Sequence, residues 1–264
     1  MLNPIFWWNL LFAFIVGGIT ITFATIMGDK FGSKIGGFVI GLPTTVFVAF
    51  LFIGISQGAD VASQAAIVFP ISVSIGALFV VGVAYFSKKK FLTGFLAGLL
   101  IWLILASILL ISNVQHLITS LILFVTILIF SHYILFKKIK FKKEKFSKKK
   151  LTKKEIIIRA IFSGIVVSLA VFLSKIGGPI FGGLFAAFPA GFISSLVIAN
   201  KSQGPDFARS MCKSMMVSGM INTTAYAMLV RILYPKIGIL YGTILSYLII
   251  IPIAILTYKY LKKR

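Results

Sequence analysis

Two segments rich in glycine, 35–45 with one proline and 176–191 with two, carry the residue types that could form a binding site inside a membrane. A proline within a helix removes a backbone donor and collides with the preceding turn, so nearby carbonyl groups lose their usual partners. Those carbonyls, with neighbouring hydroxyl and amide groups, could line a site for a solute. The candidate substrate-binding residues are Pro43, Thr44, Thr45, Pro189, Ser194, Ser195 and Asn222. The alternative is that the small residues serve only close helix packing around a kink.

Two lysines, Lys34 and Lys175, each stand in a Ser-Lys-Ile-Gly-Gly block and are candidates for attracting anions. We expect each block to open a helix, where unpaired amides and the helix dipole favour negative charge. The functional interpretation is that each lysine attracts anions to an entrance of the protein. The alternative is a pair of interfacial lysines whose stems lie in lipid while their ammonium groups reach water.

Two aspartates, Asp60 and Asp206, occupy the same place in a Ser-Gln-Gly-x-Asp-x-Ala block that occurs twice. Each block directly precedes an apolar run, so each carboxylate is expected near a helix N-terminus, where it can cap free amides and meet the positive end of the dipole. The alternative to capping is a symmetric pair of gating residues, one near each face of the membrane.

The other reactive side chains form no catalytic or metal-binding pattern. Five carboxylates and two histidines are scattered along the chain, no carboxylate falls near the middle of an apolar run, and no nucleotide-binding fingerprint occurs. We therefore expect no enzymatic activity, no cofactor and no metal, and a cation exchanger built on a buried carboxylate is disfavoured. His132 is the one candidate for proton transfer inside the membrane, with helix packing as its alternative role.

These residues must be positioned by membrane-spanning helices. The chain of 264 residues is 59% hydrophobic, with a mean hydropathy of +1.06. Apolar runs of about 20 residues recur, long enough to cross a bilayer core of about 30 Å, and lipid offers no partners to an open backbone. The sequence predicts an all-α polytopic membrane protein of about nine spans. The expected spans are about 5–27, 35–56, 60–86, 91–112, 117–136, 156–174, 177–199, 206–230 and 237–260.

The net charge of +22 is distributed as in a multi-pass protein of the cell membrane and not as in a nucleic-acid-binding protein. Eleven lysines and Arg159 lie between Phe136 and Ala160, and most other basic residues lie in short loops. A cytoplasmic Lys137–Lys154 loop leaves 24 basic residues inside and three outside, with the N-terminus out and the C-terminus in. That loop could also lie on anionic lipid headgroups.

The sequence also contains an internal duplication. The Ser-Lys-Ile-Gly-Gly block returns after 141 residues, whereas the proline and the aspartate block return after 146, so the second copy is expected to hold five extra residues. Two matched blocks in the same order indicate a repeat. The expected units are residues 1–116, a first four-helix repeat, residues 117–155, a linking helix and the Lys-rich loop, and residues 156–264, a second four-helix repeat.

The two copies lie five crossings apart, so the second enters the membrane from the opposite side. The predicted architecture is therefore a 4+1+4 inverted repeat, which is characteristic of secondary transporters whose halves alternately open a central site to either face. Because one chain already holds both orientations, a monomer suffices for this arrangement.

The order of features in the first copy resembles a known family. A basic residue and small residues, Gly-Leu-Pro-Thr-Thr, an apolar run, a Gly-containing turn and an Ala-rich span are similar to the GlpM-like group of four-span inner-membrane proteins. The resemblance covers about residues 33–110 and 174–258, and the second copy departs from it at Pro189-Ala190-Gly191. It implies that a four-span unit able to pair head-to-tail has been fused through a linking helix, and it implies no activity.

The expected function is that of a secondary transporter or flippase for a small or lipid-linked anion. The inverted repeat, the interrupted helices and the scarcity of buried acid favour it. Two alternatives stay open: a non-transporting scaffold for envelope-building enzymes that docks through the Lys137–Lys154 loop, and an ion channel. The expected partners are the lipid bilayer and a solute that the sequence does not name.

Overall fold

The computed structural model describes residues 4–29, 33–88, 90–141 and 152–263, and every regular element among them is a helix. The helices are α1 (Pro4–Asp29), α2 (Ser33–Ile40), α3 (Thr44–Gln57), α4 (Ala59–Phe86), α5 (Phe91–Ser112), α6 (Leu117–Tyr133), the π-helical turn η1 (Ile134–Lys138), α7 (Lys153–Gly177), α8 (Pro179–Ala186), α9 (Ala190–Gln203), α10 (Pro205–Ile237) and α11 (Ile239–Lys262). Most of the Lys137–Lys154 loop, residues 142–151, lies outside the described residues.

Nine segments of the described chain are long and apolar enough to cross a membrane, which confirms the predicted number of spans. α2 with α3 forms one span, α8 with α9 forms another, and α6 continues into η1. The largest difference from the expected bounds is α10, which runs to Ile237 instead of about residue 230. Arg231 and Lys236 end the apolar run, but the helix continues because long basic side chains can reach water from a helix end.

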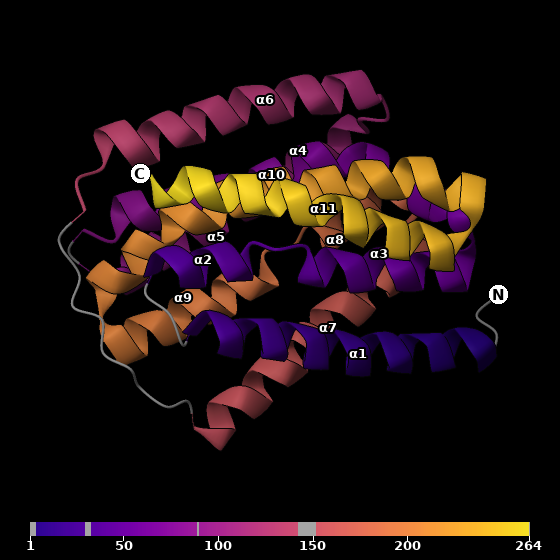
Figure 1. Cartoon of the computed structure of the whole chain (residues 1–264), viewed down its shortest axis with the longest axis horizontal. Coiled ribbons are helices and arrows are strands. Elements are labelled where there is room, and N and C mark those ends of the chain that lie inside the picture. Colours follow the sequence, from indigo (N-terminus) through magenta and orange to yellow (C-terminus); the bar gives the residue numbers. More distant parts are fainter. Residues whose placement is uncertain (1–3, 30–32, 89, 142–151, 264) are drawn as a thin grey trace.

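The helices lie mainly along the long axis of the molecule, and the chain begins and ends at opposite ends of that axis (Figure 1). α4 and α10 pack against each other. The most apolar stretch of α4 is 89% buried within the protein, whereas that of the span made by α6 and η1 is 11% buried. α4 therefore belongs to the core of the bundle, and α6 lies along its outside (Figure 1).

α1 and α7 cross each other closely through glycines (Figure 1). A Cβ atom added to Gly18 would lie 2.7 Å from the carbonyl oxygen of Ala160, and one added to Gly164 would lie 2.6 Å from that of Phe14. Small residues let two backbones approach in this way, which favours helix association in lipid through van der Waals contact.

Two consecutive short helices, α2 and α3, match another two, α8 and α9, in length and order. α2 and α8 each hold 8 residues, α3 and α9 each hold 14, and each helix of the second pair begins 146 residues after its counterpart. The expected five extra residues in the second copy are therefore wrong. The two Ser-Lys-Ile-Gly-Gly blocks occupy different places, the first at the start of α2 and the second at the end of α7.

The same register corrects the prediction for Lys175. The first block begins α2, but the second lies at the end of α7, where Lys175 stands in the last turn and Gly178 terminates the helix with a φ of +82°. Lys175 is exposed and does not open a helix. Lys34 does, as predicted, since it is the second residue of α2.

Candidate functional site

The span that begins with α2 and the span that begins with α8 are each interrupted at a proline. Pro43 has φ −74° and ψ 46°, and Pro189 has φ −77° and ψ 45°. In each case the amide after the proline donates a hydrogen bond to the carbonyl before it, from Thr44 to Leu42 and from Ala190 to Phe188, both at 2.7 Å. This is close to an inverse γ-turn. The prediction that both membrane helices break at these prolines is confirmed.

The hydrogen bonds that lead into the two breaks also correspond. The amide of Gly41 donates to the carbonyl of Gly37 at 3.1 Å, and the amide of Ala187, 146 residues later, donates to that of Gly183 at 3.2 Å. The two turns therefore have the same backbone structure although different side chains surround them. A proline has no N–H to continue the helical ladder, so the chain closes a short turn and starts a new helix.

The two breaks lie on one cavity of about 40 Å³. A space of about 10–15 Å³ by the same measure admits one water molecule, so this cavity has room for only a few. α4 and α10 complete its wall. It is lined by Ile40, Gly41, Leu42, Thr45, Val46, Phe69, Val73, Gly76, Ala186, Ala187, Phe188, Pro189, Gly191, Phe192, Gly219 and Thr223.

Of the predicted substrate-binding residues, Thr45 and Pro189 line this cavity. Pro43 is at the break, and its carbonyl accepts a hydrogen bond of 3.2 Å from the hydroxyl of Tyr247. The hydroxyl of Thr44 is directed to the carbonyl of Leu42 at 3.5 Å. One of the carbonyls expected to face a solute is therefore already occupied by a protein donor.

The other three candidates are not among the residues that line the cavity. Ser194 donates to the carbonyl of Gly191 at 3.2 Å, and Ser195 is fully buried. The amide of Asn222 bonds Ser218 at 3.0 Å on its nitrogen side and accepts from Thr257 at 3.2 Å on its oxygen side. This face of α10 is buried, but its polar groups hold helices together.

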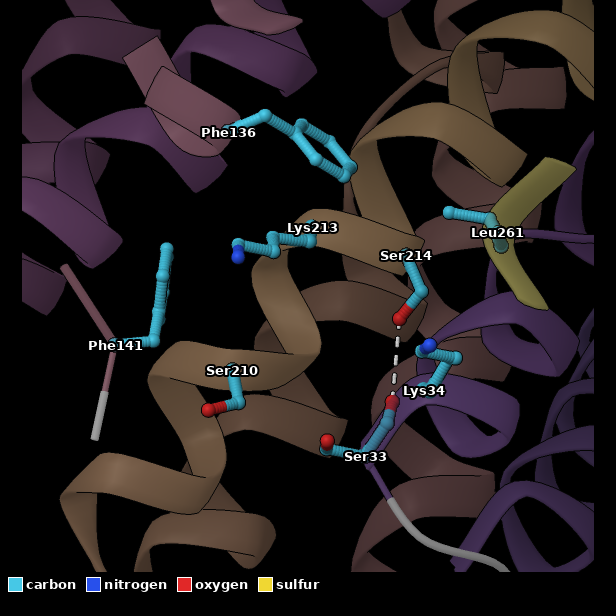
Figure 2. A pocket seen from close by; sticks show the side chains of 8 residues that line it. All are labelled: Ser33, Lys34, Phe136, Phe141, Ser210, Lys213, Ser214 and Leu261. Atoms are coloured by element: carbon cyan, nitrogen blue, oxygen red, sulfur yellow. Dashed lines mark hydrogen bonds between the residues drawn. The ribbon is translucent and has the colours of Figure 1, made fainter. Parts of the chain in front are cut away.

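A second cavity, of about 140 Å³, contains two lysines (Figure 2). We call it the cationic pocket, and it is lined by Ser33, Lys34, Phe136, Phe141, Ser210, Lys213, Ser214 and Leu261. Figure 2 shows Lys213 reaching from α10 toward Phe141, and its ammonium nitrogen lies 4.3 Å from the centre of that ring. The lining residues that the structure describes include no carboxylate.

The start of α2 forms one wall of the cationic pocket. The hydroxyl of Ser214 donates to the carbonyl of Ser33 at 3.2 Å and so ties α10 to this helix start. Lys34 follows Ser33, so its charge adds to the positive end of the α2 dipole. No sequence pattern pairs Lys34 with Lys213, because the two are far apart in the chain and only the helix packing brings them together.

Asp60 and Asp206 lie in the first turns of α4 and α10, as predicted. The capping positions themselves are held by Gly58 and Gly204, whose φ angles are +102° and +91°. A glycine adopts this backbone conformation without strain. Asp206 also lies 3.6 Å from the guanidinium of Arg209, so it takes part in an ion pair of the same helix.

By the length and apolarity of nine helices, the described chain belongs to the class of multi-pass, all-helical membrane proteins. A family model described as "Protein of unknown function (DUF3147)" matches residues 10–117, from within α1 to the first residue of α6. No curated protein and no solved structure matches the chain. The resemblance to the GlpM-like group stays a prediction.

Proposed function

We propose that the protein is a secondary transporter or flippase that works by alternating access between two inverted four-helix halves. The observation that carries the proposal is the meeting of two matching helix breaks, at Pro43 and Pro189, on one cavity between α4 and α10. Interrupted helices at corresponding places of two inverted halves are typical of the binding sites of such transporters.

The directions of the broken helices support the inversion. α3 leaves its break toward one end of the molecule, and α9 leaves its break toward the other (Figure 1). The packing partners are exchanged in the same way: α2 packs on α10, and α8 packs on α4. The family model matches residues 10–117, which is nearly the whole of the first proposed half, residues 1–116, and one residue beyond it.

Two close backbone contacts between the halves also correspond. A Cβ atom added to Gly37 would lie 2.7 Å from the carbonyl oxygen of Met211, and one added to Gly183 would lie 2.3 Å from that of Ala65. Gly183 follows Gly37 by 146 positions, and Met211 follows Ala65 by the same number, so the two contacts are equivalent with the halves exchanged. This correspondence supports a pseudo-two-fold axis between α4 and α10.

The orientation rests on the distribution of charge. With the C-terminus in the cytoplasm, 24 basic residues lie inside and three outside, which agrees with the positive-inside rule. The two ends of the chain lie at opposite ends of the bundle, as an odd number of crossings requires (Figure 1). The cationic pocket then faces the cytoplasmic side, which supports an anion as the transported group.

The size of the central cavity supports a closed state. Small-molecule sites usually occupy about 300–1,000 Å³, whereas the space at the breaks is about 40 Å³. A solute can therefore enter only if the halves move apart. The glycine contacts between α2 and α10, and between α8 and α4, lie at the interfaces where such a movement would occur.

The test uses cysteines at matched cavity positions, Thr45→Cys and Gly191→Cys, which are 146 residues apart. The native Cys212 is fully buried, so it adds little background. An impermeant thiol reagent applied to sealed vesicles of either orientation should label each cysteine from both sides. The additional changes Pro43→Ala and Pro189→Ala restore two backbone donors, should let the helices continue, and should reduce labelling at least tenfold.

Three results would contradict alternating access. Labelling from one side alone would indicate a fixed cavity, and absence of labelling from both sides would favour a non-transporting scaffold. Labelling from both sides together with single-channel current in a planar bilayer would favour a channel. Membrane abundance of each variant, measured by quantitative immunoblot of vesicles, separates these outcomes from loss of folded protein.

A further inference from the structure

A third cavity lies beside the cationic pocket. Its volume is about 450 Å³, and its exposed lining is almost entirely apolar. We call it the apolar groove, and it is lined by Leu128, Ile129, His132, Tyr133, Lys137, Val217, Ile221 and Tyr260. The groove opens beside α6, whose span is 11% buried, so it faces the lipid.

Three helices carry residues from the cationic pocket into the apolar groove. On α10, Lys213 and Ser214 line the pocket, and Val217 and Ile221 continue the same face into the groove. In η1, Phe136 lines the pocket and the next residue, Lys137, lines the groove. In α11, Leu261 lines the pocket and the preceding residue, Tyr260, lines the groove. The pocket and the groove are therefore adjoining parts of one amphiphilic surface.

The chemistry of the pocket selects an anion. Lys34 and Lys213 each carry an ammonium group with three donors. The hydroxyls of Ser210 and Ser214 already donate to backbone carbonyl groups, so the two ammonium groups are the donors that a ligand would meet. The two positive charges repel each other across the pocket. An anion between them would attract both and so offset this repulsion. Phosphate oxygens accept several charge-assisted hydrogen bonds at once, so a phosphate group suits this donor set.

The groove has the chemistry of a hydrocarbon site with one polar edge. Leu128, Val217 and Ile221 supply aliphatic surface. His132 and Tyr260 satisfy each other through a hydrogen bond between the imidazole Nε2 and the phenolic oxygen. Because these two groups are hydrogen-bonded to each other, a hydrocarbon chain can lie against them at little cost.

The depths of the two hollows suit a lipid. α10 begins at Pro205, and at 1.5 Å per residue Lys213 lies about 12 Å and Ile221 about 24 Å from that start. The charged part of the surface is therefore nearer the end of the bundle, and the apolar part is nearer its middle. A bilayer lipid has its headgroup and chain in the same order.

We propose that the cationic pocket and the apolar groove together bind one lipid phosphate. Its phosphate group is held between Lys34 and Lys213, and its hydrocarbon chain lies against α6 and α10 in the groove. Free phosphate lacks the chain and binds much more weakly. The inference does not depend on transport, since a scaffold or a carrier could hold this lipid.

The experiment measures binding of dodecyl phosphate to the full chain in a neutral maltoside detergent, by microscale thermophoresis. Two comparisons test the two parts of the ligand. Inorganic phosphate should bind at least tenfold more weakly, and dodecyltrimethylammonium, which has the same chain and the opposite charge, should not compete. Equal affinity for inorganic phosphate would overturn the proposal, as would competition by the ammonium amphiphile.

Variants test the two parts of the site. The double change Lys34→Gln and Lys213→Gln should raise Kd for dodecyl phosphate at least tenfold, whereas Lys90→Gln and Lys236→Gln, both at exposed lysines outside the lining, should leave it unchanged. If the double variant does not fold, Lys34→Gln alone must raise Kd several-fold, because Lys34 is exposed and its replacement leaves the packing intact.

The groove has its own matched pair on α6. Ile129→Trp fills the groove and should raise Kd several-fold, whereas Ile122→Trp, two turns earlier on the same helix and outside the lining, should not. Equal Kd values for these two variants would remove the groove from the site. Equal Kd values for the lysine variant and its control would remove the pocket.

Discussion

The centre of the molecule and its two ends differ in how closely one proposed half matches the other. At the centre, four backbone hydrogen bonds around Pro43 recur around Pro189 at a constant shift of 146 residues. At the end, Lys34 and Lys213 line the cationic pocket, whereas the residues related to them by the same shift are Ile180 and Ile67. The other end of the bundle therefore has no such pair of lysines at the corresponding positions.

This difference agrees with a division of labour in the proposed carrier. A central site must function in both orientations, so its two breaks are equivalent. An entrance needs to recognise the solute on one side alone, and its charge can be confined to one half. The initial interpretation of Lys34 and Lys175 as a symmetric pair is therefore replaced by an asymmetric one, with Lys34 and Lys213 at one end.

The largest expected effect concerns the inversion itself. Lys90 and Lys236 are both exposed, precede α5 and α11, and are 146 residues apart. Lys90→Cys should react with an impermeant thiol reagent only from the cytoplasmic side, and Lys236→Cys only from the outside, because an inverted repeat places equivalent positions on opposite faces. Reaction of both cysteines from the same side would end the comparison between inverted halves.

The spans and the breaks could be predicted from sequence because they depend on local chemistry. About 20 apolar residues are enough to define a crossing, and the missing N–H of Pro43 or Pro189 is enough to interrupt one. The lipid-facing and buried sides of these helices are much harder to predict. Helices such as α3 and α5 are apolar all round, so no periodic pattern records which face turns inward.

Contacts between distant residues explain the remaining differences. Asn222 was expected to bind a solute, but Thr257 of α11 and Ser218 occupy its amide group. The position of Lys213 beside Lys34 likewise depends on how α10 packs on α2. A single sequence indicates that a polar group within the membrane needs a partner, and it does not indicate which partner.

A smaller effect concerns the close contacts between the halves. Gly37→Ala and Gly183→Ala place a Cβ atom within 2.7 Å and 2.3 Å of a backbone carbonyl oxygen, which cannot move away as a flexible side chain can. Overpacking of this kind typically destabilises by about 1–3 kcal/mol. We expect both variants to unfold at lower temperature in detergent, by similar amounts, when followed by intrinsic fluorescence.

Gly191→Ala is the matched control, since its Cβ atom would meet its nearest neighbour, Ile40, at an ordinary 3.7 Å. Its unfolding temperature should stay close to that of the unmodified protein. If Gly37→Ala and Gly183→Ala differed widely from each other, the two interfaces would not be equivalent and the pseudo-symmetry at the centre would be weaker than the backbone turns indicate.

The smallest expected effect concerns an asymmetry at the centre. The hydroxyl of Tyr247 donates to the carbonyl of Pro43, but the residue related to Tyr247 by the shift of 146 is Ile101, which has no hydroxyl to offer Pro189. Tyr247→Phe keeps the ring that packs edge-on against Phe47 and removes only this bond. A hydrogen bond of this kind contributes about 0.5–1.5 kcal/mol.

The removal of this bond should loosen the first break and leave the second unchanged. We expect Tyr247→Phe to speed thiol labelling of Thr45→Cys several-fold and to leave labelling of Gly191→Cys as it was, because the lost bond holds only the Pro43 turn. Tyr241→Phe, at an exposed tyrosine of the same helix, is the control for a lost hydroxyl. Equal acceleration at both cysteines would mean that the two breaks open together, and the tyrosine would then hold the whole centre closed.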